Sequence, residues 1–329
     1  MFQASGRRFI KYENDKITEQ KKITSVLMVL FLIFILSACN GGGGGGSADD
    51  NVDPNAKDRD NTPVVLKTEA PGDKEFGTSD AKVDYSNSDK GYIMVKYSGS
   101  NSKVKLQLSY KEKTYYYDLD TNGNWEAFPL SSGSGDYKVG IYEHLTGEQY
   151  KPLFTESFNA KLKDEFEPFL HPNQYVNYTD KSKAVVMSEE VCAGSKSDLG
   201  AVERMFNYVV DNIEYDYDKA KNVKSGYIPN IDETLNTGKG ICFDYASVLG
   251  SMLRAQRIPC KLVIGYAGSA YHAWISVYTE ETGWVENMIQ FTGDKWTYMD
   301  PTFAASGNDS DPNLVGDGDT NNYKAEYFY

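Results

Sequence analysis

The sequence predicts an all-β domain followed by an α+β domain, both carried behind an export leader. Three observations predict this order: an apolar run from Val26 to Leu36, an alternation of apolar and polar residues from about Ala81 to Leu162, and helical spacing after Tyr178. With 329 residues, 40% of them hydrophobic, the chain is long enough for two domains with their own cores.

The leader has the pattern of an export signal. Lys21 and Lys22 precede the apolar run, which is shorter than the ~20 residues that a spanning helix needs, and Ser37-Ala38-Cys39 follows it. The segment resembles a bacterial lipoprotein signal, which implies removal of residues 1–38 and lipid attachment to Cys39. An ordinary secretory signal is the alternative. We therefore expect the protein at the outer face of the cell membrane, held there by the lipid anchor alone.

Residues 39–75 are expected to form a flexible tether. Six glycines, Gly41–Gly46, and a stretch rich in Ser, Asp, Asn and Pro cannot bury enough apolar surface to become ordered.

The net charge of −13, with 47 acidic against 34 basic residues, removes the electrostatic attraction that drives nucleic-acid binding. Nucleic acid is therefore excluded as an expected partner.

Residues 76–165 predict a β-sandwich of the immunoglobulin-like type with five to seven strands. Alternation is clearest at Val104-Leu106-Leu108 and at Tyr137-Val139-Ile141, and further strands are expected at residues 92–97, 115–119 and 125–129. The run 118–123 resembles the start of a calcium loop, but Pro129 stands where a bidentate Glu is needed. We expect a tight hairpin turn at Asn122-Gly123 instead. The sandwich could act as a spacer or as a module that recruits substrate.

A connector at residues 166–180, with Pro168 and Pro172, leads into the second domain, residues 181–329. Apolar spacing predicts one helix ending near Gly194, and a second that begins at Asp198 as its N-cap. A flexible run at residues 234–240 then precedes a third helix, which Cys242 opens.

The second domain contains the residue types of a nucleophilic site. A cysteine in the first turn of a helix lies at the positive end of the helix dipole, which favours the thiolate. His272 is one of three histidines, and it falls on a predicted strand, Tyr271–Tyr278. Asp300 follows another short strand pattern, Trp296–Met299, and could orient the imidazole.

These residues resemble the transglutaminase-like branch of the papain-fold thiol enzymes. Gly-Ile-Cys242-Phe-Asp-Tyr-Ala, His272-Ala-Trp and Asp300-Pro-Thr occur in the family's order, within a resemblance that covers roughly residues 184–305. The resemblance implies an α+β papain-like fold. It also implies Cys242 as nucleophile, His272 as general base and acid, and Asp300 as the group that orients His272.

The implied reaction is acyl transfer through a thioester, on amide bonds of proteins or peptides, with cell-wall peptides among the candidates. Resolution by water makes a peptidase or deamidase, and resolution by an amine makes a cross-linking transglutaminase; hydrolysis is weakly favoured because water is the most abundant acceptor. The alternative is a non-catalytic binding or adhesion lipoprotein that reuses the fold. No cofactor or metal is expected, because the chain has no Cys-x-x-Cys and no closely spaced His pair.

Some roles stay open at the level of sequence. The backbone N–H of Cys242 is the expected first oxyanion donor, and Asn236 is one candidate for the second, with a turn asparagine favoured. Cys192 and Cys260 could form a disulfide or remain two buried thiols. The aromatic residues 327–329 suggest that the C-terminal end docks on the core.

Overall fold

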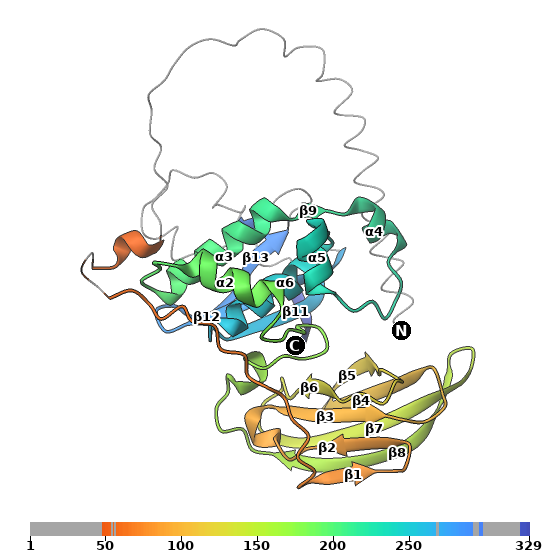
Figure 1. Ribbon diagram of the computed structural model, residues 1–329. Helices are drawn as coiled ribbons and strands as arrows, with labels where there is room; N and C mark the ends of the chain where they lie inside the picture. Colours follow the sequence, from red (N-terminus) through yellow and green to blue (C-terminus); the bar gives the residue numbers. More distant parts are fainter. Residues whose placement is uncertain (1–47, 54, 56, 268–269, 292–295, 299–322) are drawn as a thin grey trace, which may run out of the picture.

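The computed structural model describes residues 48–53, 55, 57–267, 270–291, 296–298 and 323–329. The predicted leader, the lipidation residue Cys39 and the predicted orienting residue Asp300 lie outside the described residues. Figure 1 shows two bodies: a lower one made of strands, and an upper one in which helices cover a sheet. No helix among the described ranges is long and apolar enough to cross a membrane.

The lower body is a β-sandwich of two antiparallel four-stranded sheets. One sheet has the order β1-β2-β3-β6 and the other β5-β4-β7-β8. Their bounds are β1 Glu75–Gly77, β2 Ala81–Asp84, β3 Tyr92–Tyr97, β4 Val104–Tyr110, β5 Lys113–Asp118, β6 Glu126–Pro129, β7 Gly135–Thr146 and β8 Gln149–Ala160. The sandwich thus has more strands than expected, because β1, β2 and the edge strand β8 lack a clear alternation. β8 is largely exposed and contains Pro152, which an edge position tolerates.

The expected hairpin at Asn122-Gly123 is wrong, although a turn is present. The backbone N–H of Asn122 donates to Asp120 Oδ1 at 2.8 Å, and Gly123 has a φ of +80°. Strands β5 and β6 on either side belong to different sheets, so the turn carries the chain across the sandwich. The turn itself follows from the local residues. Which strands pair on either side of it depends on the tertiary structure, so the local sequence could not predict it.

The upper body packs helices against a five-stranded antiparallel sheet of order β14-β13-β12-β11-β15. Its helices are α2 Lys183–Cys192, α3 Asp198–Asn212, α4 Tyr217–Asn222, α5 Ile231–Thr237 and α6 Cys242–Ala255. Its strands are β11 Cys260–Ala267, β12 Ala270–Thr279, β13 Gly283–Phe291, β14 Trp296–Tyr298 and β15 Tyr323–Phe328, with a small pair β9 Glu214–Tyr215 and β10 Lys239–Gly240. Helix α6 is almost entirely buried between the other helices and strands β11 and β12.

Several expected elements are confirmed, with two corrections. Helix α2 and the start of α6 at Cys242 fall where the spacing predicts them. Helix α3 is capped by Ser197, whose Oγ accepts from the N–H of Gly200 at 2.9 Å, so Asp198 is its first helical residue. Residues 234–240 are not a flexible run: they form the end of α5, a left-handed Gly238 cap and β10.

The first described segment differs from the expected flexible tether. From residue 57 to 74 the chain runs along the helical body and then onto the sandwich, as the orange trace in Figure 1 shows. The Val64 N–H donates to the Ala255 carbonyl at 2.8 Å, and the Glu69 N–H donates to the Tyr92 hydroxyl at 3.2 Å. We call residues 57–70 the strap. Its order comes from these tertiary hydrogen bonds, which its composition does not reveal.

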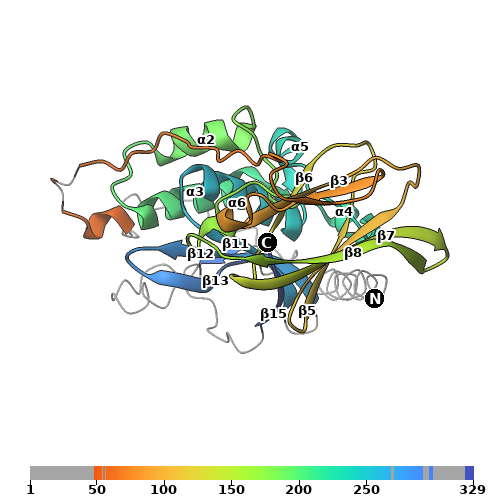
Figure 2. The same cartoon turned by 90° about the horizontal axis from the view of Figure 1, so that it is seen from below.

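The two bodies share one continuous hydrophobic core. Where they meet, five rings form an aromatic cluster. Tyr329 lies with its ring 5.7 Å from Tyr115, 5.7 Å from Tyr117 and 4.7 Å from Tyr175, and Tyr175 lies 5.3 Å from Phe243. Figure 2 shows the two bodies and the C-terminal end from below. The sandwich is therefore linked to Phe243, the residue that follows Cys242, through the rings of Tyr329 and Tyr175.

Candidate active site

Cys242 is the first residue of the buried helix α6. Ile241 precedes it in an extended conformation, and its carbonyl accepts from the N–H of Asp244 at 2.8 Å. The positive end of the helix dipole lies at this first turn and favours negative charge beside it. The helix start therefore favours the thiolate of Cys242, as the sequence predicts.

A buried carboxylate, Asp244, fixes this helix start. Its oxygens accept from the Ile241 N–H at 2.8 Å and the Tyr227 hydroxyl at 2.5 Å, and they pair with Lys219 Nζ at 2.7 Å. Burial and this hydrogen bond raise the pKa of Tyr227, so its hydroxyl stays protonated and donates. The network joins the segment between α4 and α5 to the first turn of α6. The local sequence does not reveal this network, because only Asp244 at the third helical position indicates a cap.

His272 lies on β12, which packs against α6. Its ring stacks on Trp274 at 6.3 Å, so the two share one face of the strand. Burial lowers the pKa of His272 to about 4, and its Nε2 has no hydrogen-bond partner among the described residues. At neutral pH the imidazole is therefore uncharged and able to accept a proton.

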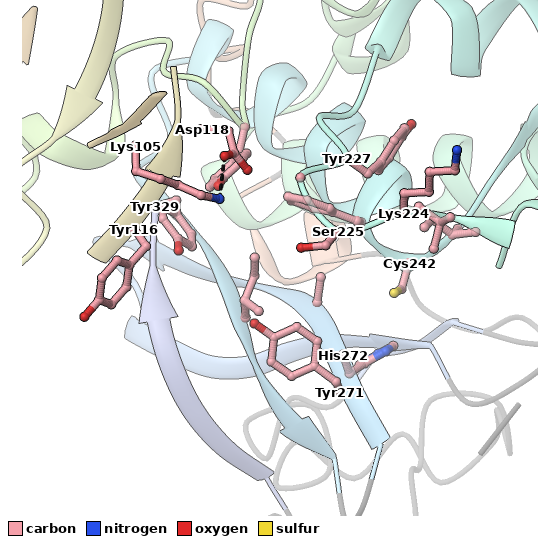
Figure 3. A pocket seen from close by; sticks show the side chains of 17 residues that line it. Lys105, Tyr116, Asp118, Lys224, Ser225, Tyr227, Cys242, Tyr271, His272 and Tyr329 are labelled. Carbon is pink, nitrogen blue, oxygen red and sulfur yellow. Dashed lines mark ion pairs between the residues drawn. The ribbon is translucent and has the colours of Figure 1, made fainter. Parts of the chain in front are cut away.

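Cys242 and His272 line the same pocket, of about 160 Å³. Figure 3 shows the Cys242 sulfur directed from the helix start toward the strand that carries His272. Both side chains are nearly buried, at 4% and 8% exposure, so the pocket admits only a slender group. The third predicted residue, Asp300, lies outside the described residues.

The walls of this pocket come from both bodies. Lys105 of β4 and Asp118 of β5 belong to the sandwich, and they form an ion pair at 2.5 Å that Figure 3 marks with a dashed line. Tyr227, Tyr271 and Tyr329 complete the walls from the helical body. Sequence analysis missed the sandwich residues, because nothing in a local strand pattern indicates which face another domain covers.

Three further expectations concern neighbouring residues. Asn236 does not line the pocket: it lies exposed in α5 and accepts from Lys183 Nζ at 3.2 Å, so it is neither an oxyanion donor here nor a turn residue. Cys192 and Cys260 are both free and buried, which favours the two-thiol alternative over the disulfide. Burial raises the pKa of Cys192 to about 11 and also raises that of Cys260.

The arrangement can carry out nucleophilic chemistry. A thiol at a helix start and a neutral imidazole share one small pocket, so the thiol proton has an acceptor nearby. Within the described part of the chain, no group of His, Cys, Asp and Glu side chains could hold a metal ion.

The fold and the pocket together define an α+β domain in which a helix-start thiol faces a strand imidazole. Residues 186–301 match the family model of the transglutaminase-like superfamily, so this part of the chain is similar to transglutaminase-like domains. The sequence-based expectation of an α+β domain of this kind behind a β-rich region is confirmed.

Individual proteins show more limited similarity. The UPF0252 protein MJ1282 of Methanocaldococcus jannaschii is 29% identical over 145 residues, which make up 40% of this chain and 40% of that protein. The chain thus matches less than half of that relative's length. A crystal structure of a candidate cysteine protease from Cytophaga hutchinsonii has a TM-score of 0.33 at 14% identity, covering 64% of this chain and 67% of that one. Red sea bream transglutaminase has a TM-score of 0.26 at 13% identity, with coverages of 64% and 48%.

Proposed function

We propose that this protein is a surface-anchored thiol enzyme that acts on amide bonds of proteins or peptides through a thioester on Cys242. The observation that carries the proposal is the shared pocket of Cys242, at the start of α6, and His272, on β12. Export and anchoring through Cys39 are part of the proposal and rest on the leader sequence alone.

The proposed mechanism follows from the charge states of the two groups. The Cys242 thiol gives its proton to the neutral His272, and the sulfur attacks the substrate carbonyl. The tetrahedral intermediate expels the amine, which takes the proton from His272, and a thioester remains. Water then attacks the thioester, losing a proton to His272, and the thiol is restored as the acid product leaves. Asp300 is proposed to orient the His272 ring.

The backbone N–H groups at the start of α6 support the oxyanion in this proposal. They point along the helix axis at the place where the thiolate and the developing oxyanion both lie. We propose hydrolysis over transfer to an amine, because water is the most abundant acceptor outside the cell.

The test is the pH dependence of iodoacetamide labelling at each cysteine, measured by peptide mass spectrometry on the folded protein. We expect Cys242 to label rapidly at about pH 5–6, below the range in which a free thiol reacts, because the helix start and a His272 ring that has taken up the thiol proton both stabilise the thiolate. Labelling should slow at least tenfold in His272→Ala. The buried thiols Cys192 and Cys260 serve as internal controls and should stay unlabelled.

If Cys242 labels no faster than a free thiol, or if His272→Ala leaves its labelling rate unchanged, the proposal of a thiol enzyme is wrong. The alternative, a non-catalytic binding protein, is then favoured. An enzyme in addition requires that Cys242→Ala abolish release of acid or amine products from peptide substrates.

A further inference from the structure

The pocket of Cys242 adjoins a larger hollow that lies between the wet face of one sandwich sheet and strands β11, β12 and β15. The hollow has a volume of about 590 Å³ and shares Lys105, Tyr116 and Tyr271 with the pocket of Cys242. We call this hollow the tyrosine groove. Its tyrosines are Tyr116, Tyr142, Tyr150, Tyr266, Tyr271 and Tyr327. Its size is that of a site for a ligand several residues long, whereas the pocket admits a single slender group.

The sandwich side of this groove is a flat surface built from three adjacent strands. In register, Gln107 of β4 lies opposite Tyr116 of β5 and Gly140 of β7. A Cβ at Gly140 would lie 2.5 Å from the ring of Tyr142, so the absence of a side chain there lets that ring lie over the sheet. The wet face of the sheet is thus an aromatic platform beside the catalytic pocket.

The tyrosine groove carries an excess of negative charge. Its one lysine, Lys105, is paired with Asp118 at 2.5 Å. Its two carboxylates, Glu148 and Glu326, have no ion-pair partner among the described residues. Tyrosine faces and unpaired carboxylates both attract cations, the first through the ring quadrupole and the second through charge.

We infer that the tyrosine groove binds the segment of a polypeptide substrate beside the reacting amide, and selects a basic side chain, Lys or Arg, in that segment. The inference rests on the proposed function, because it gives a substrate property to the same site. Polypeptide is the occupant because the groove is continuous with a pocket whose thiol would attack an amide. The sandwich is then part of the substrate site, in accord with its packing against Phe243 through Tyr175 and Tyr329.

The test is peptide binding to the full-length Cys242→Ala protein, measured by fluorescence anisotropy. The probes are fluorescein-labelled peptides of Gly and Ser around one Gln, with an Arg placed at successive positions on either side of it. Matched peptides carry citrulline, which has the shape of Arg without its charge. We expect the best Arg peptide to bind about tenfold more tightly than its citrulline partner. The difference should shrink as salt is raised.

Variants locate the effect in the groove. Glu148→Gln with Glu326→Gln should reduce the preference for Arg to about twofold or less, and Tyr142→Ala should weaken binding of the Arg peptide severalfold. Glu112→Gln is the matched control, because Glu112 is an exposed carboxylate of the sandwich outside the groove, and it should leave binding unchanged.

Equal binding of Arg and citrulline peptides, or no binding by the whole set, overturns the inference. Binding of a β-1,4-linked N-acetylglucosamine hexamer that depends on Tyr142, in place of peptide, also overturns it in favour of a glycan site. Because Cys242→Ala removes the thiol, these outcomes are independent of the labelling test. If Cys242 is unreactive in the parent protein but the groove still prefers Arg, the proposed enzyme activity is wrong. The groove would then be a peptide-binding site without catalysis.

Discussion

The environment of His272 couples the proposed chemistry to stability. Its pKa falls from about 6.5 in an unfolded chain to about 4 in the fold, because burial disfavours the charged form. The folded state therefore resists protonation that the unfolded state accepts. Stability contributed by the neutral ring is complete above about pH 6.5, and it is lost as the pH falls toward 4.

We expect His272→Gln to remove this loss. Between about pH 7 and pH 4 the parent protein should lose up to about 3 kcal/mol more unfolding free energy than the variant, since each unit of pKa shift corresponds to about 1.4 kcal/mol. Urea unfolding of both proteins across this range measures the difference. Other groups in the window, such as His171, titrate in both proteins and cancel in the comparison. Parallel curves for the two proteins would contradict the expected burial of an uncharged ring.

At this scale the sequence predicted the elements that carry the proposed reacting groups better than it predicted their surroundings. Cys242 and His272 were placed on the right elements, because a helix start and an alternating strand are local patterns. The partners of Asp244 could not be predicted, since Lys219 and Tyr227 approach it from another element. The oxyanion role considered for Asn236 fails because proximity along the chain does not place a side chain in a pocket, and the favoured turn role fails because residue 236 lies in α5.

At the scale of elements, the pairing of β11 with β15 brings the C-terminal strand to the site. Gly265 of β11 lies opposite His272 in the register with β12. A Cβ at Gly265 would lie 2.1 Å from the Lys324 carbonyl oxygen and 2.9 Å from the Ala325 Cα, both backbone atoms of β15. Only a residue without a side chain lets β15 approach, and β15 brings Tyr327 and Tyr329 to the groove and the pocket.

We expect Gly265→Ala to displace β15 and to cost about 1–3 kcal/mol of unfolding free energy, as overpacking against backbone does. Gly250→Ala in α6 is the control, because its Cβ would meet side chains at ordinary distances of 3.4 to 3.6 Å and alanine favours a helix. Chemical denaturation gives the energies, and limited proteolysis after residue 322 reports release of the strand. Equal stability of the two variants would show that β15 does not depend on this close approach.

Elements with a strong period were predictable and their partners were not. Strands β4 and β7 and helices α2 and α6 follow from alternation or helical spacing alone. Strand β8, with few buried side chains, gives no such signal, and the crossing between β5 and β6 resembles a hairpin until the sheets are known. The short helix α5 depends on its Asn230 cap and on Gly238, and the sequence had suggested residues 234–240 as a flexible run.

At the scale of the whole molecule, the strap and the aromatic cluster bind the two bodies to each other. Arg59 of the strap pairs with Asp198 at the start of α3 and donates to Gln256 Oε1 at 2.9 Å at the end of α6. Further along, the Glu69 carbonyl accepts from Asn87 Nδ2 of the sandwich at 3.0 Å. The sandwich is thus held at a fixed place beside the pocket, which a groove made by both bodies requires.

This architecture predicts one cooperative unfolding transition. A chain with one continuous core and interlocked bodies should lose both bodies together, whereas independent domains would unfold in separate steps. Far-UV circular dichroism and tryptophan fluorescence should therefore give coincident denaturation curves. Trp125 reports on the sandwich, and Trp274 and Trp284 report on the helical body.

Arg59→Ala should lower the midpoint of this single transition, with a loss of about 2–4 kcal/mol, because it leaves the buried Gln256 Oε1 and the Asp198 carboxylate without the Arg59 guanidinium. Lys57→Ala, an exposed neighbour in the same segment, should change the midpoint little. A variant whose sandwich and helical signals separate would mean that the strap holds the bodies together. Two unfolding transitions in the parent protein would instead mean that the bodies fold independently. The tyrosine groove, which both bodies line, would then have no rigid wall.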